Sequence, residues 1–222
     1  MNHRLYLDIE TLPAGEEYRE KLEYLYKKKR EKEEEKSGKT KGDFEQFLSG
    51  TSFDGAFGRI LCIAYAIDDK PTEVLYEGGD EKKMLEKFWE IVKSLSRESN
   101  NWQYPDYGVQ FIGHNVMDFD LRFIYQRSIV QSVKPAYDLS FARYKSYPIY
   151  DTMKEWSRWS MTNIGLESIA LALDIPTPKD GIDGSQVARF HKEGKDKEIC
   201  EYCKRDVDAT RKVYKRMIFY GE

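Results

Sequence analysis

The sequence predicts an α/β fold in which a mixed β-sheet is flanked by helices. Two observations predict it: an apolar strand and a β-hairpin come first, and short strands then alternate with helical segments. The chain has 222 residues, of which 40% are hydrophobic and 14% aromatic, so it can bury a sizeable core. We expect a single domain over residues 1–222.

The first predicted strand carries two acids. Residues 4–9 begin the run RLYLDIETLP and are mostly apolar, which predicts a buried strand. Asp8 and Glu10 lie two positions apart in this run, and strand side chains alternate, so both carboxylates point to the same face. Two like charges on a buried strand repel each other and resist desolvation. The strand therefore raises the question of what compensates them.

A charged segment follows at about residues 16–50. Its run KKKREKEEEK, residues 27–36, mixes both signs of charge, which supports a solvated helix through pairs four residues apart. Leu22, Leu25 and Tyr26 add a short apolar stripe at helical spacing. We predict a solvent-facing helical insertion, and a basic tip that touches a nucleic-acid backbone is the alternative.

The rest of the chain alternates strands and helices. Residues 58–68 (GRILCIAYAID) predict a central strand, and residues 72–78 predict its antiparallel partner after a turn. Residues 80–95 carry apolar side chains at helical spacing, with Asp80 as the N-cap. The remaining elements expected are strands over 108–115 and 148–150 and helices over 118–128, 164–175 and 195–219, with Asp151 as an N-cap.

Charge and cysteine content narrow the class of protein. The net charge is −3, whereas domains that coat nucleic acid are usually basic; a local patch with metal ions is compatible with this value. Three cysteines are too few for a disulfide scaffold, which favours a reducing compartment. There is no signal-peptide pattern and no run long enough to cross a membrane. We expect a cytoplasmic protein without a membrane partner.

Two later segments place acids on predicted helices. Asp120 lies on the same helical stripe as Phe123 and Ile124, where a carboxylate is costly unless something positive meets it. Tyr202 and Asp206 are four residues apart and share one face of the C-terminal helix. Acids from separated segments could therefore meet at one end of the central strand.

A meeting of Asp8, Glu10, Asp120 and Asp206 would need cations, because four carboxylates repel one another. Oxygen-only ligands favour Mg²⁺ or Mn²⁺. The alternative is four unrelated acids, each with its own local role, as Asp118 is explained as an N-cap or a first-turn acid of its helix. Spacing alone does not decide between the two.

These residues resemble the three exonuclease motifs of the DEDD superfamily of 3′–5′ exonucleases. LDIET, residues 7–11, resembles the first motif, D-x-E. GHNVMDFD, residues 113–120, resembles the second, with a spacing similar to the proofreading domains of B-family DNA polymerases. YCKRD, residues 202–206, matches the third in its tyrosine form, Y-x-x-x-D (DEDDy). The likeness is to stand-alone, predicted B-polymerase-like 3′–5′ exonucleases, and it covers most of the chain except about residues 16–50.

The resemblance implies a ribonuclease H-like fold, a five-stranded mixed sheet with helices on both sides. It implies that Asp8, Glu10, Asp120 and Asp206 hold two Mg²⁺ or Mn²⁺ ions for two-metal hydrolysis. Tyr202 would position the attacking water, because a phenol with a pKa of about 10 is a poor base at neutral pH.

The resemblance also implies contacts with nucleic acid. Asn115 would hydrogen-bond near the terminal nucleotide, or else serve as a turn residue. Leu12 and Phe119 would stack on the terminal bases, although core packing is the better explanation of Phe119. Thr11 belongs to the same expected contact, whereas His114 is expected to be structural.

The function expected is that of a metal-dependent 3′–5′ exonuclease that hydrolyses single-stranded DNA or frayed 3′ ends to nucleoside 5′-monophosphates. RNA is the substrate alternative, because nothing in the motifs reads the 2′-hydroxyl. Two other classes stay open: an inactive nucleic-acid-binding module of the same fold, and a thiol oxidoreductase built on Cys200 and Cys203. The sequence does not indicate a protein partner.

Overall fold

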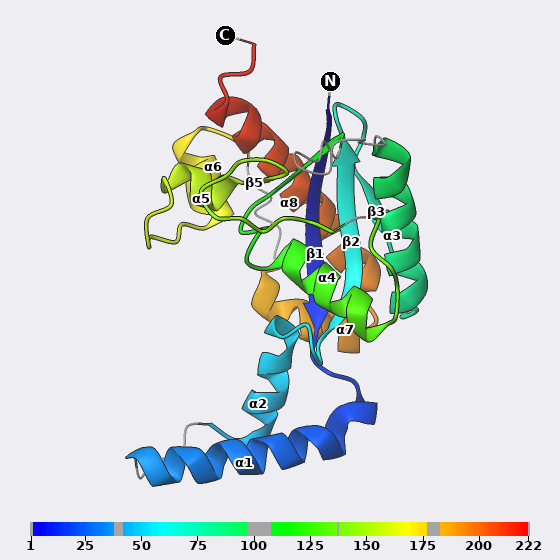
Figure 1. The fold of residues 1–222 in the computed structure, drawn as a ribbon, viewed down its shortest axis with the longest axis vertical. Coiled ribbons are helices and arrows are strands. Elements are labelled where there is room, and N and C mark those ends of the chain that lie inside the picture. Colours follow the sequence, from blue (N-terminus) through cyan, green and yellow to red (C-terminus); the bar gives the residue numbers. More distant parts are fainter. Residues whose placement is uncertain (1, 38–41, 97–107, 137, 177–182, 222) are drawn as a thin grey trace.

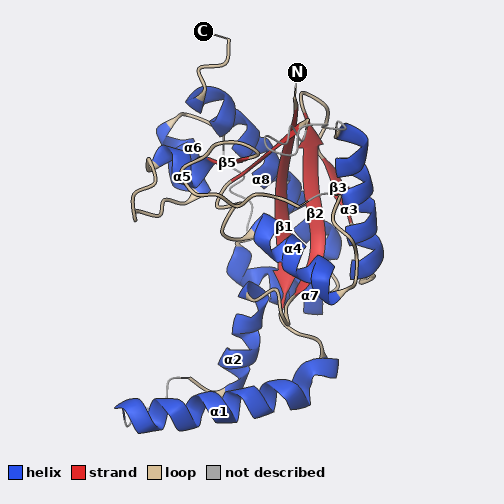
Figure 2. Ribbon diagram, in the orientation of Figure 1, coloured by secondary structure: helices blue, strands red, loops and turns tan. Residues whose placement is uncertain are grey.

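The structure, a computed structural model, describes residues 2–37, 42–96, 108–136, 138–176 and 183–221. The strands in these parts of the chain are β1 (His3–Leu12), β2 (Arg59–Ile67), β3 (Glu73–Leu75), β4 (Val109–Gly113) and β5 (Ile149–Asp151). They form one five-stranded sheet in the order β3-β2-β1-β4-β5 (Figure 2). β1–β2 and β2–β3 are antiparallel, whereas β1–β4 and β4–β5 are parallel. The mixed five-stranded sheet predicted from the sequence is confirmed.

Helices cover both faces of this sheet (Figure 1). The helices are α1 (Arg19–Ser37), α2 (Phe44–Gly50), α3 (Glu81–Leu95), α4 (Asp120–Val130), α5 (Thr152–Trp156), α6 (Leu166–Ala172), α7 (Val187–Lys192) and α8 (Asp196–Met217). α3 and α4 pack on one face, and α8 packs across β1 and β2 on the other. Within the described residues, no helix combines the length and apolar character needed to cross a membrane. The predicted helices are present with ends shifted by a few residues, and α4 ends later than predicted, at Val130.

β1 is buried on both faces because its side chains alternate between two apolar clusters. Leu5, Leu7 and Ile9 pack in the larger cluster with apolar residues of α3 and α4. Tyr6 packs on the opposite face with side chains of β2 and α8. The two acids of β1 follow on the face of Tyr6, so they lie between the sheet and α8.

α1 and α2 project away from the sheet beyond the end of β1 (Figure 1). Aromatic packing joins the two helices: the Tyr26 ring centroid lies 5.6 Å from that of Phe44 and 5.5 Å from that of Phe47. Exposed ion pairs, such as Arg30 to Glu34 at 3.4 Å, run along α1. The segment predicted as an insertion thus contains two helices, and the division of the chain into one domain with an insertion stays a prediction.

A buried ion pair fixes α4 against α3. Arg127 on α4 is 1% exposed and Glu81 on α3 is 7% exposed, and two guanidinium nitrogens lie 3.0 and 2.7 Å from the two carboxylate oxygens. Glu81 also accepts a hydrogen bond from the Ile60 amide of β2 at 2.8 Å, and Arg127 donates to the Gly55 carbonyl at 3.3 Å. This network ties α4, which begins with Asp120, to the sheet.

Replacing Arg127 by Met should lower the free energy of unfolding by about 3–5 kcal/mol, because Glu81 would stay buried without a counter-charge. Arg122→Met is the matched control, because Arg122 lies on the same helix, is 50% exposed and pairs with Asp118 at 3.4 Å. That exposed pair should contribute at most about 1 kcal/mol. Urea denaturation followed by circular dichroism measures both variants, and equal losses would contradict this account.

Candidate active site

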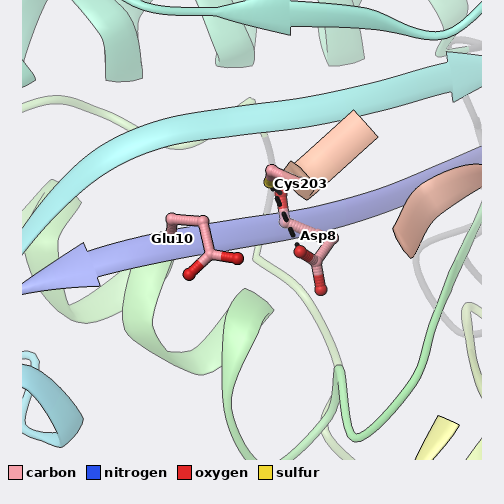
Figure 3. Close-up of side chains that lie close together, drawn as sticks. All are labelled: Asp8, Glu10 and Cys203. Atoms are coloured by element: carbon pink, nitrogen blue, oxygen red, sulfur yellow. Dashed lines mark hydrogen bonds between the residues drawn. The ribbon is translucent and has the colours of Figure 1, made fainter. Parts of the chain in front are cut away.

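Asp8 and Glu10 leave the same side of β1 (Figure 3). Glu10 is only 8% exposed, and Asp8 is half-buried. The pairing of β1 with β2 is regular through Glu10 and shifts between Glu10 and Thr11. Such irregularities end regular pairing and re-aim side chains. Both carboxylates therefore lie just before the point where the regular ladder ends.

Asp120 reaches β1 from the first residue of α4. The ladder between β1 and β4 ends at Tyr6, and beyond it the Ile9 amide donates to Asp120 Oδ1 at 3.0 Å. The Asp120 side chain is 3% exposed. The Asp120 carboxylate thus accepts the hydrogen bond that a neighbouring strand would otherwise accept. This bond holds Asp120 beside Asp8 and Glu10.

Asp151 holds the turn that leads from β4 to Asp120. As predicted, it caps α5, accepting from the Met153 amide at 3.0 Å and the Lys154 amide at 3.2 Å. The same carboxylate accepts from the amides of Asn115 and Met117, each at 3.0 Å. Asn115 has a left-handed φ of 61°, a conformation that Asn tolerates better than most residues. The sequence predicted the cap of α5 but not the clamp on this turn.

α8 brings Tyr202, Cys203 and Asp206 to the acids of β1. The Cys203 thiol lies 3.3 Å from Asp8 Oδ2 and 3.4 Å from the Asp8 carbonyl oxygen (Figure 3). Potential ligand atoms of Asp8, Glu10 and Cys203 all lie within 4.8 Å of one another. The sequence suggested a role for Cys203 only as a pair with Cys200, although its place beside Tyr202 was a signal that it could face the site.

The four acids act on one another electrostatically. Burial raises the pKa of Asp8, and the charges of Asp120, Glu10 and Asp206 raise it further. Burial and the charges of Asp206 and Asp120 likewise raise the pKa of Glu10. Burial raises the pKa of Asp120 to about 7, although the Ile9 amide opposes the rise. Acids from the beginning, the middle and the end of the sequence therefore lie close enough to raise one another's pKa. Their catalytic roles stay predictions.

Tyr202 is half-buried beside these acids. Burial raises the pKa of its phenol above the ordinary value of 10.0, and the charge of Asp206 raises it further. Burial also raises the pKa of Asp206, and the Tyr202 hydroxyl opposes that rise. Tyr202 is therefore protonated at neutral pH and can hold a water molecule but not deprotonate it.

Two residues expected to contact nucleic acid have other partners. The Thr11 hydroxyl donates to the Ser52 carbonyl at 2.8 Å. Leu12 is 4% exposed and packs in a small cluster with Leu61 and Val187. The contacts of Thr11 and Leu12 with nucleic acid stay predictions, and in this structure the Leu12 side chain packs within the protein.

Two residues of the second motif, His114 and Phe119, have contacts within the protein. His114 lies with Nδ1 3.0 Å from the Thr152 hydroxyl and Nε2 2.8 Å from the Ile164 carbonyl, which is the structural role expected of it. Phe119 is partly buried against the larger cluster, and its ring centroid lies 6.2 Å from that of Phe53. Phe53 is 75% exposed and precedes β2, and it lies in none of the sequence motifs.

Asp118 and Asp208 lie outside the group of Asp8, Glu10, Asp120 and Asp206, which we call the acid group. The helix expected from residue 118 begins at Asp120, so Asp118 is not in its first turn. Its carboxylate pairs instead with Lys154 at 2.7 Å, which corrects the expectation of a first-turn acid. Asp208 is half-exposed; its carboxylate accepts a hydrogen bond from the Thr72 hydroxyl at 2.5 Å and pairs with Arg211 at 2.8 Å.

The cysteines do not form a reactive pair. Cys62, Cys200 and Cys203 are free and buried. Burial raises the pKa of the Cys203 thiol, and hydrogen bonding with Cys62 together with burial raises that of Cys200. Reactive thiols need a lowered pKa and some exposure. The geometry therefore argues against the oxidoreductase alternative.

A family model of predicted 3′–5′ exonucleases, related to the exonuclease domain of B-family DNA polymerases, matches residues 56–222. The chain belongs to this family. The matched range contains Asp120, Tyr202 and Asp206, whereas Asp8 and Glu10 precede it. The family confirms the kind of enzyme that the motifs predicted, a 3′–5′ exonuclease of the B-polymerase type.

Two further comparisons agree with this family. An uncharacterized protein of Methanocaldococcus jannaschii is 25% identical over 171 residues, which is 73% of this chain and 88% of that protein. The structure of the family B DNA polymerase from the hyperthermophilic archaeon Pyrobaculum calidifontis matches with a TM-score of 0.63 and 16% identity. That match covers 98% of this chain, β1 included, and 25% of the polymerase, so this chain spans a quarter of its length. The likeness confirms the ribonuclease H-like fold.

In the presence of a chelator, the free energy of unfolding should fall as the pH rises from about 4 to about 7. The native Asp120 carboxyl, with its pKa of about 7, keeps a proton that the unfolded chain, with an ordinary pKa of 3.8, has released. Stability is therefore highest below this window and is lost across it.

Asp120→Asn should flatten this fall, because the amide keeps an oxygen for the Ile9 amide and does not titrate. Glu167→Gln, at an exposed position of α6, is the control and should keep the wild-type slope. Thermal melts across the pH range measure all three proteins. A wild-type stability that rises over this window would overturn the assignment.

Proposed function

We propose that this chain is a metal-dependent 3′–5′ exonuclease that acts on single-stranded DNA or frayed 3′ ends and releases nucleoside 5′-monophosphates. The observation that carries the proposal is the grouping of Asp8, Glu10, Asp120 and Asp206, whose charges act on one another in a buried place. The chain belongs to a family of predicted 3′–5′ exonucleases, in which such a group of carboxylates would serve catalysis.

The acid group fits divalent cations. Its donors are carboxylate oxygens, which suit hard ions such as Mg²⁺ and Mn²⁺. Burial and mutual repulsion raise the pKa of Asp8 and Glu10, so nearby positive charge would stabilise their ionised forms. Asp8, Glu10, Asp120 and Asp206 would hold two ions. When bound, these ions would acidify the attacking water and offset the charge that develops on the leaving 3′ oxygen.

The protein's own residues orient the reaction. The Tyr202 phenol stays protonated and lies beside Asp206, so it can hold the attacking water against the scissile phosphate. The Cys203 thiol contacts one oxygen of Asp8 and thereby limits the rotation of that carboxylate. The bond from the Ile9 amide fixes Asp120 in the same way. These contacts supply orientation rather than proton transfer.

An aromatic pair offers a place for the terminal bases. Phe53 and Phe119 line a surface pocket together with Asp118, Arg122 and Gln126. Phe119 directly precedes Asp120, one of the four acids. Stacking on aromatic rings holds single strands without regard to sequence. Phe53 and Phe119 would therefore receive bases of the strand end.

Matched DNA and RNA oligomers of the same sequence, labelled at either end, test the substrate. With Mg²⁺ or Mn²⁺, we expect 5′-labelled DNA to shorten stepwise from its 3′ end and to release nucleoside 5′-monophosphates. Faster shortening of the RNA would make the chain an exoribonuclease. Binding without release of nucleotides would instead indicate the inactive nucleic-acid-binding module.

Asp8→Ala and Asp206→Ala should each abolish nucleotide release while leaving the fold intact, because each removes a ligand and relieves repulsion. Tyr202→Phe should lose less activity, because the metal-dependent activation of water would remain. Steady-state release from a 3′-labelled oligomer measures the three variants, with circular dichroism as the check on folding. Full activity of either acid variant, purified and folded, would defeat the site.

Phe53→Ala should raise KM for single-stranded DNA by about tenfold, the loss of one base stack, with little change in kcat. Phe219→Ala is the matched control, because Phe219 is 70% exposed and lies beyond the end of α8. An unchanged KM in Phe53→Ala, or an equal rise in both variants, would remove Phe53 from the substrate path.

A further inference from the structure

Arg205 is a cation of α8 that directly precedes Asp206 and that no motif assigns a role. At about 100° per residue, it lies about 60° around the helix from Tyr202 and about 160° from Cys203. Cys203 faces the sheet, because its thiol contacts Asp8. Arg205 therefore flanks the stripe of Tyr202 and Asp206 on the side of α8 opposite Cys203.

Arg205 forms no ion pair within the part of the chain that the structure describes. Its side chain is half-buried, and its Nε is shielded from solvent and makes no hydrogen bond. The neighbouring cations of α8 are paired: Lys204 lies 3.0 Å from Glu201, and Arg211 lies 2.8 Å from Asp208. A guanidinium held partly out of water without an acceptor is costly. The position therefore indicates an acceptor that the free protein does not itself supply.

The positive charge of Arg205 affects the pKa of Asp206, one of the four acids. Burial raises the pKa of Asp206, and the Arg205 guanidinium opposes the rise, so the two groups lie near each other without forming an ion pair. One reading is that Arg205 only keeps Asp206 ionised. However, keeping Asp206 ionised does not explain why the Arg205 Nε is buried without a hydrogen-bond partner.

The chemistry of the substrate supplies the missing acceptor. A nucleic-acid strand carries one negative charge per phosphate toward a group of four carboxylates, so a cation beside them lowers the repulsion. A guanidinium presents its donors in a planar fork that matches two phosphate oxygens. A phosphodiester that lies next to Tyr202 and Asp206 would pass along the flank of α8 on which Arg205 stands.

We propose that Arg205 is a phosphate-binding residue that holds a phosphodiester near the 3′ end of the single strand. The inference rests on the proposed function, because it takes the strand to lie at the acid group. It deepens that function by naming a contact with the backbone, which is independent of base sequence. Arg205 thus strengthens binding and fixes the position of the strand along the site. The acids and Tyr202 act on the scissile bond.

Arg205→Gln, Arg205→Lys and the control Arg216→Gln test the proposal. Arg216 is an exposed arginine near the end of the same helix, 11 positions farther along. Binding of a 5′-fluorescent single-stranded DNA is measured by anisotropy with Ca²⁺ in place of Mg²⁺, at several salt concentrations, for each full-length variant. Nucleotide release with Mg²⁺ and the melting temperature are measured on the same preparations.

We expect Arg205→Gln to weaken binding by about tenfold at low salt and to reduce the slope of log affinity against log salt by about 0.7, the value for one phosphate of a single strand. Arg205→Lys should keep the slope and lose part of the affinity, because the charge remains and the fork is lost. Arg216→Gln should match the wild type in affinity and slope. The melting temperature of Arg205→Gln should stay that of the wild type.

An unchanged salt slope in Arg205→Gln, with wild-type protein that binds and digests the oligomer, overturns this inference and leaves the proposed function standing. A lower melting temperature together with an unchanged slope makes Arg205 structural and also overturns it. A wild-type protein that neither binds nor digests single strands refutes the proposed function, and the inference with it.

Discussion

Repulsion among carboxylates that the fold brings together is the constraint on which this structure depends. Asp8 and Glu10 share one face of a strand that is buried on both sides, and Asp120 and Asp206 add their charges to the same place. Burial raises the pKa of each of the four, so the free protein is under electrostatic strain near neutral pH. A fold that keeps such a group indicates a ligand of opposite charge.

Polar contacts outside the acid group hold it in place. Asp151 clamps the turn before Asp120 through the amides of Asn115 and Met117. The pair of Arg127 and Glu81 then fixes the helix that Asp120 begins. Each contact satisfies buried backbone or charged groups that would otherwise be costly. The site is therefore carried by regular elements and their caps rather than by loops, which suits a reaction that needs its groups held within fractions of an ångström.

The parts of the fold that follow local patterns could be predicted from the sequence. The alternation of β1 placed Asp8 and Glu10 on one face, and helical spacing placed Tyr202 with Asp206. Contacts between distant residues could not be predicted: the Ile9 amide binds a carboxylate 111 positions away, and Cys203 contacts Asp8 across 195 positions. α4 begins two residues later than expected, and Asp118, which precedes it, pairs with Lys154, a residue distant in the sequence. Phe53 belongs to no motif, and only its packing on Phe119 draws attention to it.

The most direct measurement of the central claim is anomalous diffraction from crystals soaked with Mn²⁺ and a nucleoside 5′-monophosphate. We expect two manganese peaks among Asp8, Glu10, Asp120 and Asp206, with the phosphate of the nucleotide beside them. Crystals that hold the nucleotide but have no manganese between Asp8 and Asp206 would contradict that claim.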